Sequence, residues 1–151
     1  MKTFFILFSL LFTFVICAVD ITSFRPAAHE VDGYQTVRDK NGSLVGTARK
    51  MGNRVTYRDN HGRIIGTAVI NGDRVTYRDG HGSLVGSSTT SGSRTTYRDN
   101  HGSLRGSSVS SGNRTTYRDK NGSLSGSSSR SGSRTTYRDR SGKLTGSSSG
   151  R

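Results

Sequence analysis

Arginine is the residue of this chain whose spacing points most directly to chemistry. Ten arginines recur in two series at intervals of twenty residues. A guanidinium group is always charged and donates several hydrogen bonds to phosphate, sulfate or carboxylate groups. The spacing therefore predicts an anion-binding surface. Its members are Arg54, Arg58, Arg74, Arg78, Arg94, Arg98, Arg114, Arg118, Arg134 and Arg138.

These arginines belong to a twenty-residue repeat that runs from Asp32 to the last residue. The six units cover 32–51, 52–71, 72–91, 92–111, 112–131 and 132–151, with no insertion or deletion. A fixed period of this size indicates supersecondary units that bury apolar surface against their neighbours. The repeat is therefore the structural unit that must position the arginines.

The first eighteen residues are typical of a secretory signal peptide. Lys2 precedes an apolar run from Phe4 to Ile16, and Ala18 is a small residue at the expected cleavage point. The run is too short to favour a membrane span, so an uncleaved anchor is the lesser alternative. We expect residues 1–18 to be removed and the chain to be secreted, whether it is extracellular, periplasmic or at a cell surface.

The secreted chain is expected to be strongly basic and to contain no disulfide. The formal net charge is +13, and loss of Lys2 with the signal peptide would leave +12. The same cleavage would remove Cys17, the only cysteine, so no disulfide could staple the secreted chain. Residues 19–31 match no repeat and hold the only proline. We expect them to form a leader or linker, able to pack on the first unit.

Two turn signals per repeat predict the secondary structure. One is an Asn-Gly, His-Gly or Ser-Gly pair, as at His61-Gly62, and the other is a second pair ending in Gly, as at Asn71-Gly72. Such pairs between alternating strands favour two-residue hairpin loops. Two loops leave two eight-residue strands in each repeat. We therefore predict an all-β fold in which six 20-residue strand–turn–strand repeats, residues 32–151, form an antiparallel meander.

The predicted register places each tyrosine beside glycines of the neighbouring strands. Tyr57 faces Gly66 across the first loop, and Gly66 faces Tyr77 across the next. A tyrosine ring can cover the bare backbone of a glycine, so this row is the predicted packing and assembly surface. The row contains Tyr57, Tyr77, Tyr97, Tyr117 and Tyr137 with Gly66, Gly86, Gly106 and Gly126. Beside the rings on the same face we expect Ile64, Leu84, Leu104, Leu124 and Leu144.

The opposite face of the predicted sheet combines hydroxyl groups with arginines. A middle row of Thr and Ser is flanked by Arg54 and its equivalents on one side and by Arg58 and its equivalents on the other. An open sheet would leave two unpaired edges and an exposed Tyr/Leu face. The sheet should therefore curl onto itself, pair face to face or polymerise.

Two alternatives to the meander stay open. A β-solenoid would stack each arginine on the next at about 4.8 Å, whereas the meander doubles this distance and halves the repulsion. The chain could also be largely disordered as a monomer, because each repeat offers little more than one Tyr and one Leu or Ile for burial.

The repeat resembles the YD repeat of RHS-type secreted shells and adhesins, which reads roughly Tyr-Asp-x-x-Gly-Arg-Leu. The best match is Tyr-Arg-Asp-Asn-His-Gly-Arg-Ile at 57–64, and the similarity covers all six units. The resemblance implies β-hairpin repeats that wrap into a curved wall. The repeat departs from the family in having an arginine between Tyr and Asp, and Arg63 is the only arginine before the aliphatic residue. The general plan is also similar to curlin-type amyloid subunits, without their Gln/Asn ladders.

The other reactive residue types give little support for catalysis. His61, His81 and His101 lie at hairpin tips, where we expect them to serve as turn residues, and no Ser–His–acid set converges. Asp-x-His pairs recur at these tips, but neighbouring tips should lie about 10 Å apart, too far to share one metal ion. We therefore expect no enzyme activity, no cofactor, no metal site and no small-molecule substrate.

Two functions of different classes follow from these observations. The first is a secreted, non-enzymatic structural protein that self-associates through its sheet edges or its Tyr/Leu face. The second is a basic binding module for extracellular polyanions (acidic polysaccharide, lipopolysaccharide or nucleic acid) through its Arg/Thr face. The tyrosines lie on the other face in this register, so the arginine face offers no base stacking.

Overall fold

The computed structural model describes residues 26–150, which form twelve β-strands and one short 3₁₀ helix, η3 (Ala28–Glu30). The first strands of the six repeats are β1 (Tyr34–Asp39), β3 (Arg54–Asp59), β5 (Arg74–Asp79), β7 (Arg94–Asp99), β9 (Arg114–Asp119) and β11 (Arg134–Asp139). The second strands are β2 (Leu44–Met51), β4 (Ile64–Asn71), β6 (Leu84–Ser91), β8 (Leu104–Ser111), β10 (Leu124–Ser131) and β12 (Leu144–Gly150). The predicted signal peptide lies outside the described residues. Within them, no helix is long and apolar enough to cross a membrane.

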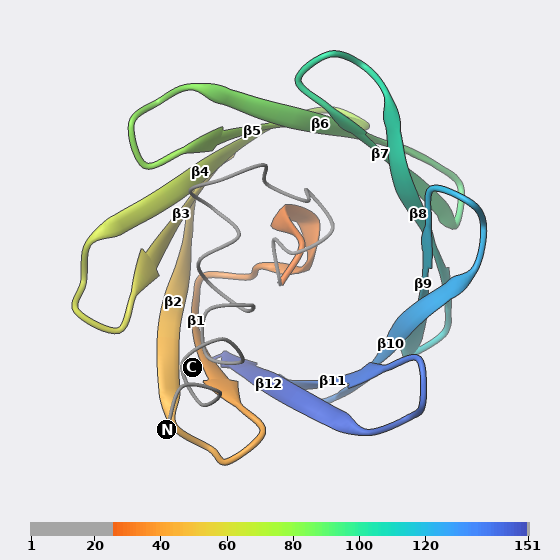
Figure 1. Ribbon diagram of the computed structural model, residues 1–151. Helices are drawn as coiled ribbons and strands as arrows, with labels where there is room; N and C mark the ends of the chain where they lie inside the picture. The colour runs from red at the N-terminus through yellow and green to blue at the C-terminus, as the bar shows by residue number, and fades with distance from the viewer. Residues whose placement is uncertain (1–25, 151) are drawn as a thin grey trace, which may run out of the picture.

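The twelve strands form one closed barrel (Figure 1). Each strand pairs antiparallel with its neighbours along the chain, and β1 pairs with β12. The all-β fold and the regular antiparallel hairpins are therefore confirmed. The open sheet is replaced by a barrel, and the repeats share the regularity of a solenoid without its parallel stacking. Because every strand has two neighbours, the barrel has no free edge.

Alternation of residue types explains the two faces of the wall. In β3, Val55 and Tyr57 are buried, whereas Arg54 and Arg58 are exposed. Successive side chains of a strand point to opposite faces, and β-branched and aromatic residues suit a half-buried strand. The Val/Thr and Tyr positions of the repeat therefore face the lumen, and its arginines face outward.

The turn after each first strand is longer than the predicted two-residue loop. In the segment Asp59–Arg63, Asp59 N–H donates to the Arg63 carbonyl (3.0 Å), and Gly62 N–H donates to the Asp59 carbonyl (3.1 Å). Gly62 has φ +83°, the left-handed conformation that glycine adopts without strain. We call this five-residue segment, and its equivalents, the Asp-turn. Its three-residue loop shortens each first strand by one residue at this end, as in Arg54–Asp59.

A β-bulge follows the Asp-turn and restores the predicted pairing. Arg58 faces Ile64, and the next pair is Tyr57 with Gly66, so Ile65 is the extra residue. The expected Tyr57–Gly66 pair is therefore correct. The bulge also changes which face the aliphatic residue occupies, because one added residue reverses the alternation.

The second turn of each repeat is displaced from its predicted position by one residue. Asn71 pairs with Arg74, so the two-residue loop is Gly72-Asp73 rather than Asn71-Gly72. Gly72 has φ +57° at the first loop position, as hairpin loops of the I′ and II′ types require. As a consequence, Gly66 faces Asp79, and Ala68 takes the predicted place of Gly66 opposite Tyr77. The continuous Tyr–Gly row was therefore wrong at every second pair.

Moving this loop by one residue shifts the pairing register by two residues, and this register shift allows the sheet to close. A line drawn across the strands through paired residues runs from Tyr57 to Gly66 and then to Asp79. Asp79 is 22 residues after Tyr57, two more than the repeat length, so the register is staggered by two residues in each repeat. Over six repeats, the stagger totals 12 residues, equal to the number of strands. The seam follows the same register, since Asp39 faces Gly146 as Asp59 faces Gly46. A barrel needs such a stagger, and here it implies strands tilted by about 35° and a Cα diameter of about 22 Å.

The N-terminal segment fills part of this wide lumen. Wall side chains can fill an eight-stranded barrel, but a twelve-stranded one is wider. Residues Pro26 to Val31, which we call the plug, lie inside the ring of strands, and Ala28 and Val31 are buried against the wall (Figure 1). Their apolar neighbours come from the first repeats and include Ala48, Val55, Ala68 and Val75. The segment therefore packs against the early repeats, and it does so from inside the barrel.

Candidate anion-binding surface

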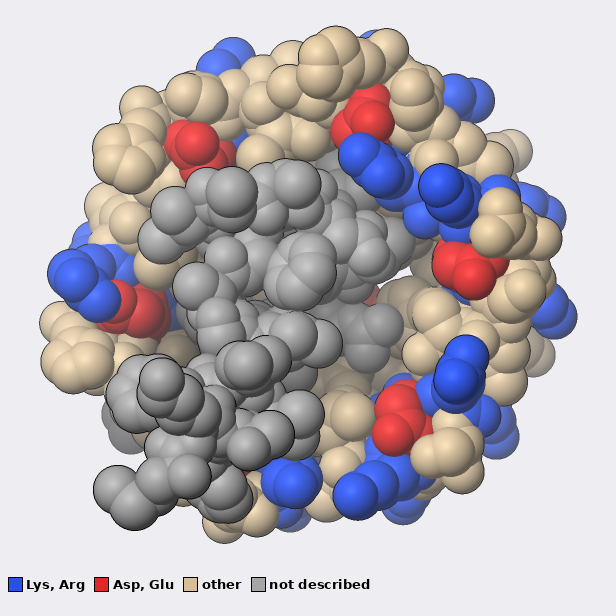
Figure 2. All heavy atoms as spheres, in the orientation of Figure 1, with Lys and Arg blue, Asp and Glu red and all other residues tan. Residues whose placement is uncertain are grey.

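Closure turns each repeated position into a ring around the barrel. The register is the same in all six repeats, so residues twenty apart are related by about one sixth of a turn around the axis. Figure 2 looks along this axis and shows Lys and Arg side chains spread around the circumference rather than gathered on one side. The two predicted series of arginines are therefore two rings on the outer wall.

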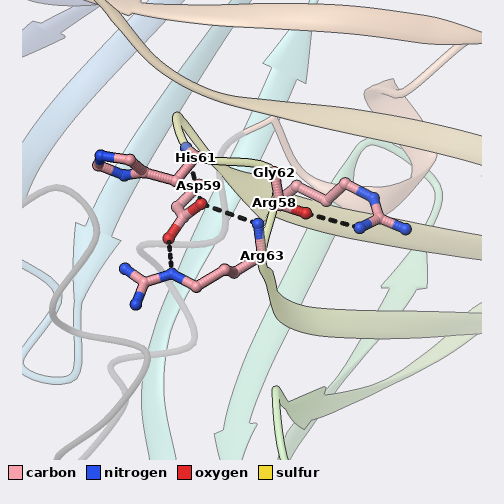
Figure 3. Close-up of polar contacts among 5 residues, drawn as sticks. All are labelled: Arg58, Asp59, His61, Gly62 and Arg63. Carbon is pink, nitrogen blue, oxygen red and sulfur yellow. Dashed lines mark hydrogen bonds and ion pairs between the residues drawn. The ribbon is translucent and has the colours of Figure 1, made fainter.

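The first ring lies next to the Asp-turns, and each member is held by its own turn. Arg58 Nη1 donates a hydrogen bond to the Gly62 carbonyl at 2.6 Å, and the five equivalent bonds are each 2.8 Å long (Figure 3). The side chains remain exposed. This Arg58 ring contains Arg38, Arg58, Arg78, Arg98, Arg118 and Arg138.

Arg38 is the member that the sequence reasoning missed. It lies twenty residues before Arg58, but the preceding position holds Val37 instead of Tyr. Counting back twenty residues from Arg58, without requiring a preceding Tyr, identifies Arg38. Its neighbour across the seam, Ser147, shows that Arg38 continues the ring between the last repeat and the first.

The second ring lies towards the Gly-Asp, Gly-Ser or Gly-Asn turns at the other end of the wall. This Arg54 ring contains Arg54, Arg74, Arg94, Arg114 and Arg134, all exposed. Tyr34 occupies the equivalent position in the first repeat. One member reaches towards the middle of the wall, where Arg94 Nη2 donates to Ser107 Oγ at 3.4 Å.

A belt of hydroxyl side chains lies between the two rings. We define the hydroxyl belt by Thr36, Thr47, Thr56, Thr67, Thr76, Ser87, Thr96, Ser107, Thr116, Ser127, Thr136 and Ser147. All twelve are half-buried or buried, whereas the arginines on both sides are exposed. Outward-facing residues of the second strands also lie between the rings, among them the exposed Arg49 and Val109. The belt thus offers hydroxyl groups between two margins of positive charge.

The acidic residues near the rings are mostly engaged by backbone. Asp59 Oδ1 accepts N–H groups of His61 and Arg63 (2.9 Å each), and its Oδ2 forms an ion pair with Arg63 Nε at 2.8 Å (Figure 3). Burial acts to raise the pKa of Asp59, but the hydrogen bonds from Arg63 and His61 outweigh it and lower the pKa. The Asp carboxylate thus stabilises the turn by accepting hydrogen bonds from its own backbone, a role typical of Asp in turns.

The ring arginines keep their charge available to a ligand. Among residues 26–150, the ion pairs are Arg63–Asp59 and Arg105–Asp99, and neither uses a member of a ring. In the same range, no three His, Cys, Asp or Glu side chains are grouped to hold a metal ion. The histidines at positions 61, 81 and 101 donate their backbone N–H to the turn aspartates.

The predicted assembly tyrosines lie inside the barrel. Tyr57, Tyr77, Tyr97, Tyr117 and Tyr137 are each 4% exposed or less. Tyr57 donates its hydroxyl to the Pro26 carbonyl of the plug at 3.2 Å, and Tyr117 donates to Glu30 Oε1 at 3.5 Å. In the later repeats the tyrosine hydroxyls bond to lumen serines, as in Tyr97–Ser108 at 3.1 Å. Burial, then the neighbouring Tyr77 and Glu30, raises the pKa of Tyr57.

The aliphatic residues expected beside the tyrosines are on the outer wall instead. Ile64, Leu84, Leu104 and Leu124 are 42–46% exposed and pair with members of the Arg58 ring. Leu144 is half-buried and pairs with Arg138. The bulge is the cause, because it moves the preceding residue to the opposite face. Each of these arginines of the Arg58 ring therefore has an aliphatic side chain beside it.

The glycines of the predicted packing row have a different role from the expected one. A Cβ placed on Gly126 would lie 2.5 Å from the carbonyl oxygen of Arg138, too close for any side chain. Gly146 meets the carbonyl oxygen of Arg38 at the same distance across the seam. The backbone of the next repeat, rather than a tyrosine ring, thus requires glycine at these two positions. Gly66, Gly86 and Gly106 face Asp79, Asp99 and Asp119 in the same register.

The fold is similar to that of a plant protein. An X-ray structure of a protein from Arabidopsis thaliana aligns with a TM-score of 0.51, over 82% of this chain and 84% of that chain. The two sequences are 9% identical, so the likeness concerns the fold alone. No family model matches the chain, and no curated protein matches it. The function therefore has to be argued from the surface of the barrel itself.

Proposed function

We propose that this protein is a secreted, non-enzymatic binding module for extracellular polyanions, and that acidic polysaccharide is its ligand class. The observation that carries the proposal is the pair of exposed arginine rings, whose members form no ion pair among residues 26–150. The formal net charge, +13 for the full chain and +12 after loss of Lys2, adds a long-range attraction to any polyanion.

The geometry also favours polysaccharide over nucleic acid. Proteins that bind single-stranded nucleic acid stack its bases on aromatic side chains beside basic ones. Here the five repeat tyrosines lie in the lumen, and Tyr34 is the tyrosine that the outer wall exposes among the described residues. Hydroxyl groups and exposed aliphatic side chains beside arginines suit sugar rings that carry sulfate or carboxylate groups.

Self-association is less well supported by the same geometry. Self-association was expected through the sheet edges or the Tyr/Leu face. Both sheet edges are paired with each other in the barrel, and the tyrosines are buried. The exposed aliphatic residues Ile64, Leu84, Leu104 and Leu124 are the remaining feature in its favour. Sedimentation of the purified chain between micromolar and millimolar concentration tests it, since a self-associating protein grows with concentration without any added polyanion.

Retention on immobilised heparin tests the proposal. The double variant Arg98→Ser/Arg118→Ser removes two adjacent members of the Arg58 ring. We expect it to elute at lower salt, with binding several-fold weaker and a log–log salt slope smaller by about 1.5, because each arginine contributes roughly 0.7–0.9 to the slope through counterion release. Circular dichroism at rising temperature checks that the barrel is intact.

A charge-matched variant separates the ring from net charge. Lys120→Asn/Arg140→Asn also removes two positive charges, at loop positions where Asn60 and Asn100 stand in other repeats. We expect it to change heparin affinity less than twofold. Equal losses in the two variants would mean that the rings form no particular site. If an oligothymidine of equal charge binds more tightly than heparin, the assignment to polysaccharide is wrong.

A further inference from the structure

The arrangement of the rings indicates how a polyanion would be held, given that the proposed function is correct. Ring members on successive repeats are two strands apart, and hence at least about 10 Å from Cα to Cα. A single sulfate or carboxylate cannot bridge this distance. Binding by several arginines therefore requires a chain that passes from one repeat to the next.

The curvature of the wall limits which chains can do so. Six repeats complete the circle, so the wall turns by about one sixth of a circle from each arginine to its neighbour. At the level of the side chains, the path around the belt is about 100 Å, or roughly 17 Å per repeat. A stiff, straight polymer would touch this cylinder along a tangent and meet few arginines. A flexible chain can follow the wall.

The hydroxyl belt offers a continuous path. Four residues separate Arg54 from Arg58 along β3, which places the two rings about 13 Å apart along the strand. A chain that follows the belt would meet hydroxyl groups along its length and arginines on both margins. The seam does not interrupt the path, because Thr36 faces Ser149 and Arg38 faces Ser147 in the standard register.

We propose that the ligand is one flexible acidic polysaccharide chain that wraps around the hydroxyl belt and contacts arginines of successive repeats at the same time. Each repeat is then a weak site, and affinity arises because binding at one repeat raises the local concentration of the chain at the next. The arginine positions are partly fixed in advance by the hydrogen bonds of the Arg58 ring to the Asp-turns, which lowers the entropic cost of ordering them.

Two variants with the same substitutions in different arrangements test this proposal. The arc variant, Arg98→Ser/Arg118→Ser/Arg138→Ser, leaves three adjacent ring members, Arg38, Arg58 and Arg78. The alternating variant, Arg58→Ser/Arg98→Ser/Arg138→Ser, leaves no two adjacent ones. Both lose three identical side chains, three charges and three turn hydrogen bonds. Their thermal unfolding should therefore match and serves as the control for folding.

The probe is heparin fractionated by length, measured by titration calorimetry at fixed salt. For chains of about 15 Å, which reach one repeat, we expect both variants to bind about twofold more weakly than the wild type. For chains of about 45 Å, the arc variant should stay within about threefold of the wild type, and the alternating variant should lose about tenfold or more. For chains of 100 Å, both variants should lose about tenfold.

Each alternative outcome has a definite meaning. If both variants weaken binding about twofold at every chain length, the arginines act singly and the wrapped arrangement is wrong, although polyanion binding stands. If wild-type affinity does not rise with chain length up to about 100 Å, wrapping is also wrong. If no heparin fraction binds the wild type, the proposed function itself fails.

Discussion

A single carboxylate organises the end of each hairpin, and Asp139 is the fullest example. Its Oδ1 accepts the Ser141 hydroxyl at 2.6 Å and the N–H groups of Ser141 and Lys143 at 2.8 and 3.0 Å. The hydrogen bond from the Ser141 side chain, with those from backbone, lowers the pKa of Asp139. The ionised form is thus the one that the turn stabilises, and the same direction holds for Asp59 and Asp99.

Acid should weaken the fold through these groups. A carboxylate whose pKa is lower in the folded state stabilises that state fully above its ordinary pKa of about 3.9. This contribution is lost as pH falls through the lower, folded pKa. We therefore expect the unfolding temperature to drop steeply below about pH 4 and to be nearly constant from pH 5 to 7.

Asp139→Asn isolates one turn. Asn keeps an oxygen acceptor and removes the charge, so the variant should melt a few degrees lower than the wild type at pH 7. The difference should shrink as the pH falls through the lowered pKa of the wild-type Asp139 carboxyl. Melting curves by circular dichroism measure it. A difference that stays constant from pH 7 to pH 2 would mean that the charge of Asp139 does not contribute.

Strands and turns show how far sequence reasoning could go and where it had to stop. Alternation in segments such as Arg-Val-Thr-Tyr-Arg-Asp correctly assigned Tyr57 to one face and Arg58 to the other. Glycine correctly marked both turns. The Asp-turn loop length and the bulge at Ile65 offset each other in the register, so no count of residues between strands reveals them. The exposed position of Ile64 was missed for this reason.

The position of the second loop, more than its length, determines whether the sheet closes into a barrel. Both Asn71-Gly72 and Gly72-Asp73 fit the chemistry of a two-residue turn, and they differ by two residues in register. The faces are the same in both, so the predicted arginines share the outer face from the second repeat onward. The stagger differs, however, and the stagger decides between a flat sheet and a barrel.

The plug lies outside the repeat, so no periodic pattern could predict its place in the lumen. Val31 is 1% exposed in the lumen, so Val31→Ala should lower the free energy of unfolding by about 1–3 kcal/mol, through lost burial and the cavity left behind. Val109→Ala is the matched control, because Val109 is 37% exposed on the outer wall. Its cost should stay below about 1 kcal/mol. Urea unfolding measures both, and equal costs would show that the plug does not belong to the core.

The whole molecule gains its properties from closure. Closure removes both edges, places the tyrosines and the plug in one interior and makes the arginines into rings. The apolar part of that interior lies in the early repeats, with Val75 and Ala68, whereas later repeats have Thr95 at the position of Val75 and Ser108 at the position of Ala68. Tyr–Ser hydrogen bonds take over there, which explains how Ser-rich repeats can still belong to a packed wall.

The central claim is that the chain closes on itself, and a disulfide across the seam tests it most directly. Thr36 on β1 and Ser149 on β12 are paired residues that face outward, within the Cα spacing that a disulfide needs. We would make Thr36→Cys/Ser149→Cys in a Cys17→Ser background and oxidise it at low protein concentration. We predict rapid, complete formation of an intramolecular disulfide in a chain that remains monomeric. Free thiols, or disulfides that join different chains, would contradict the closed barrel.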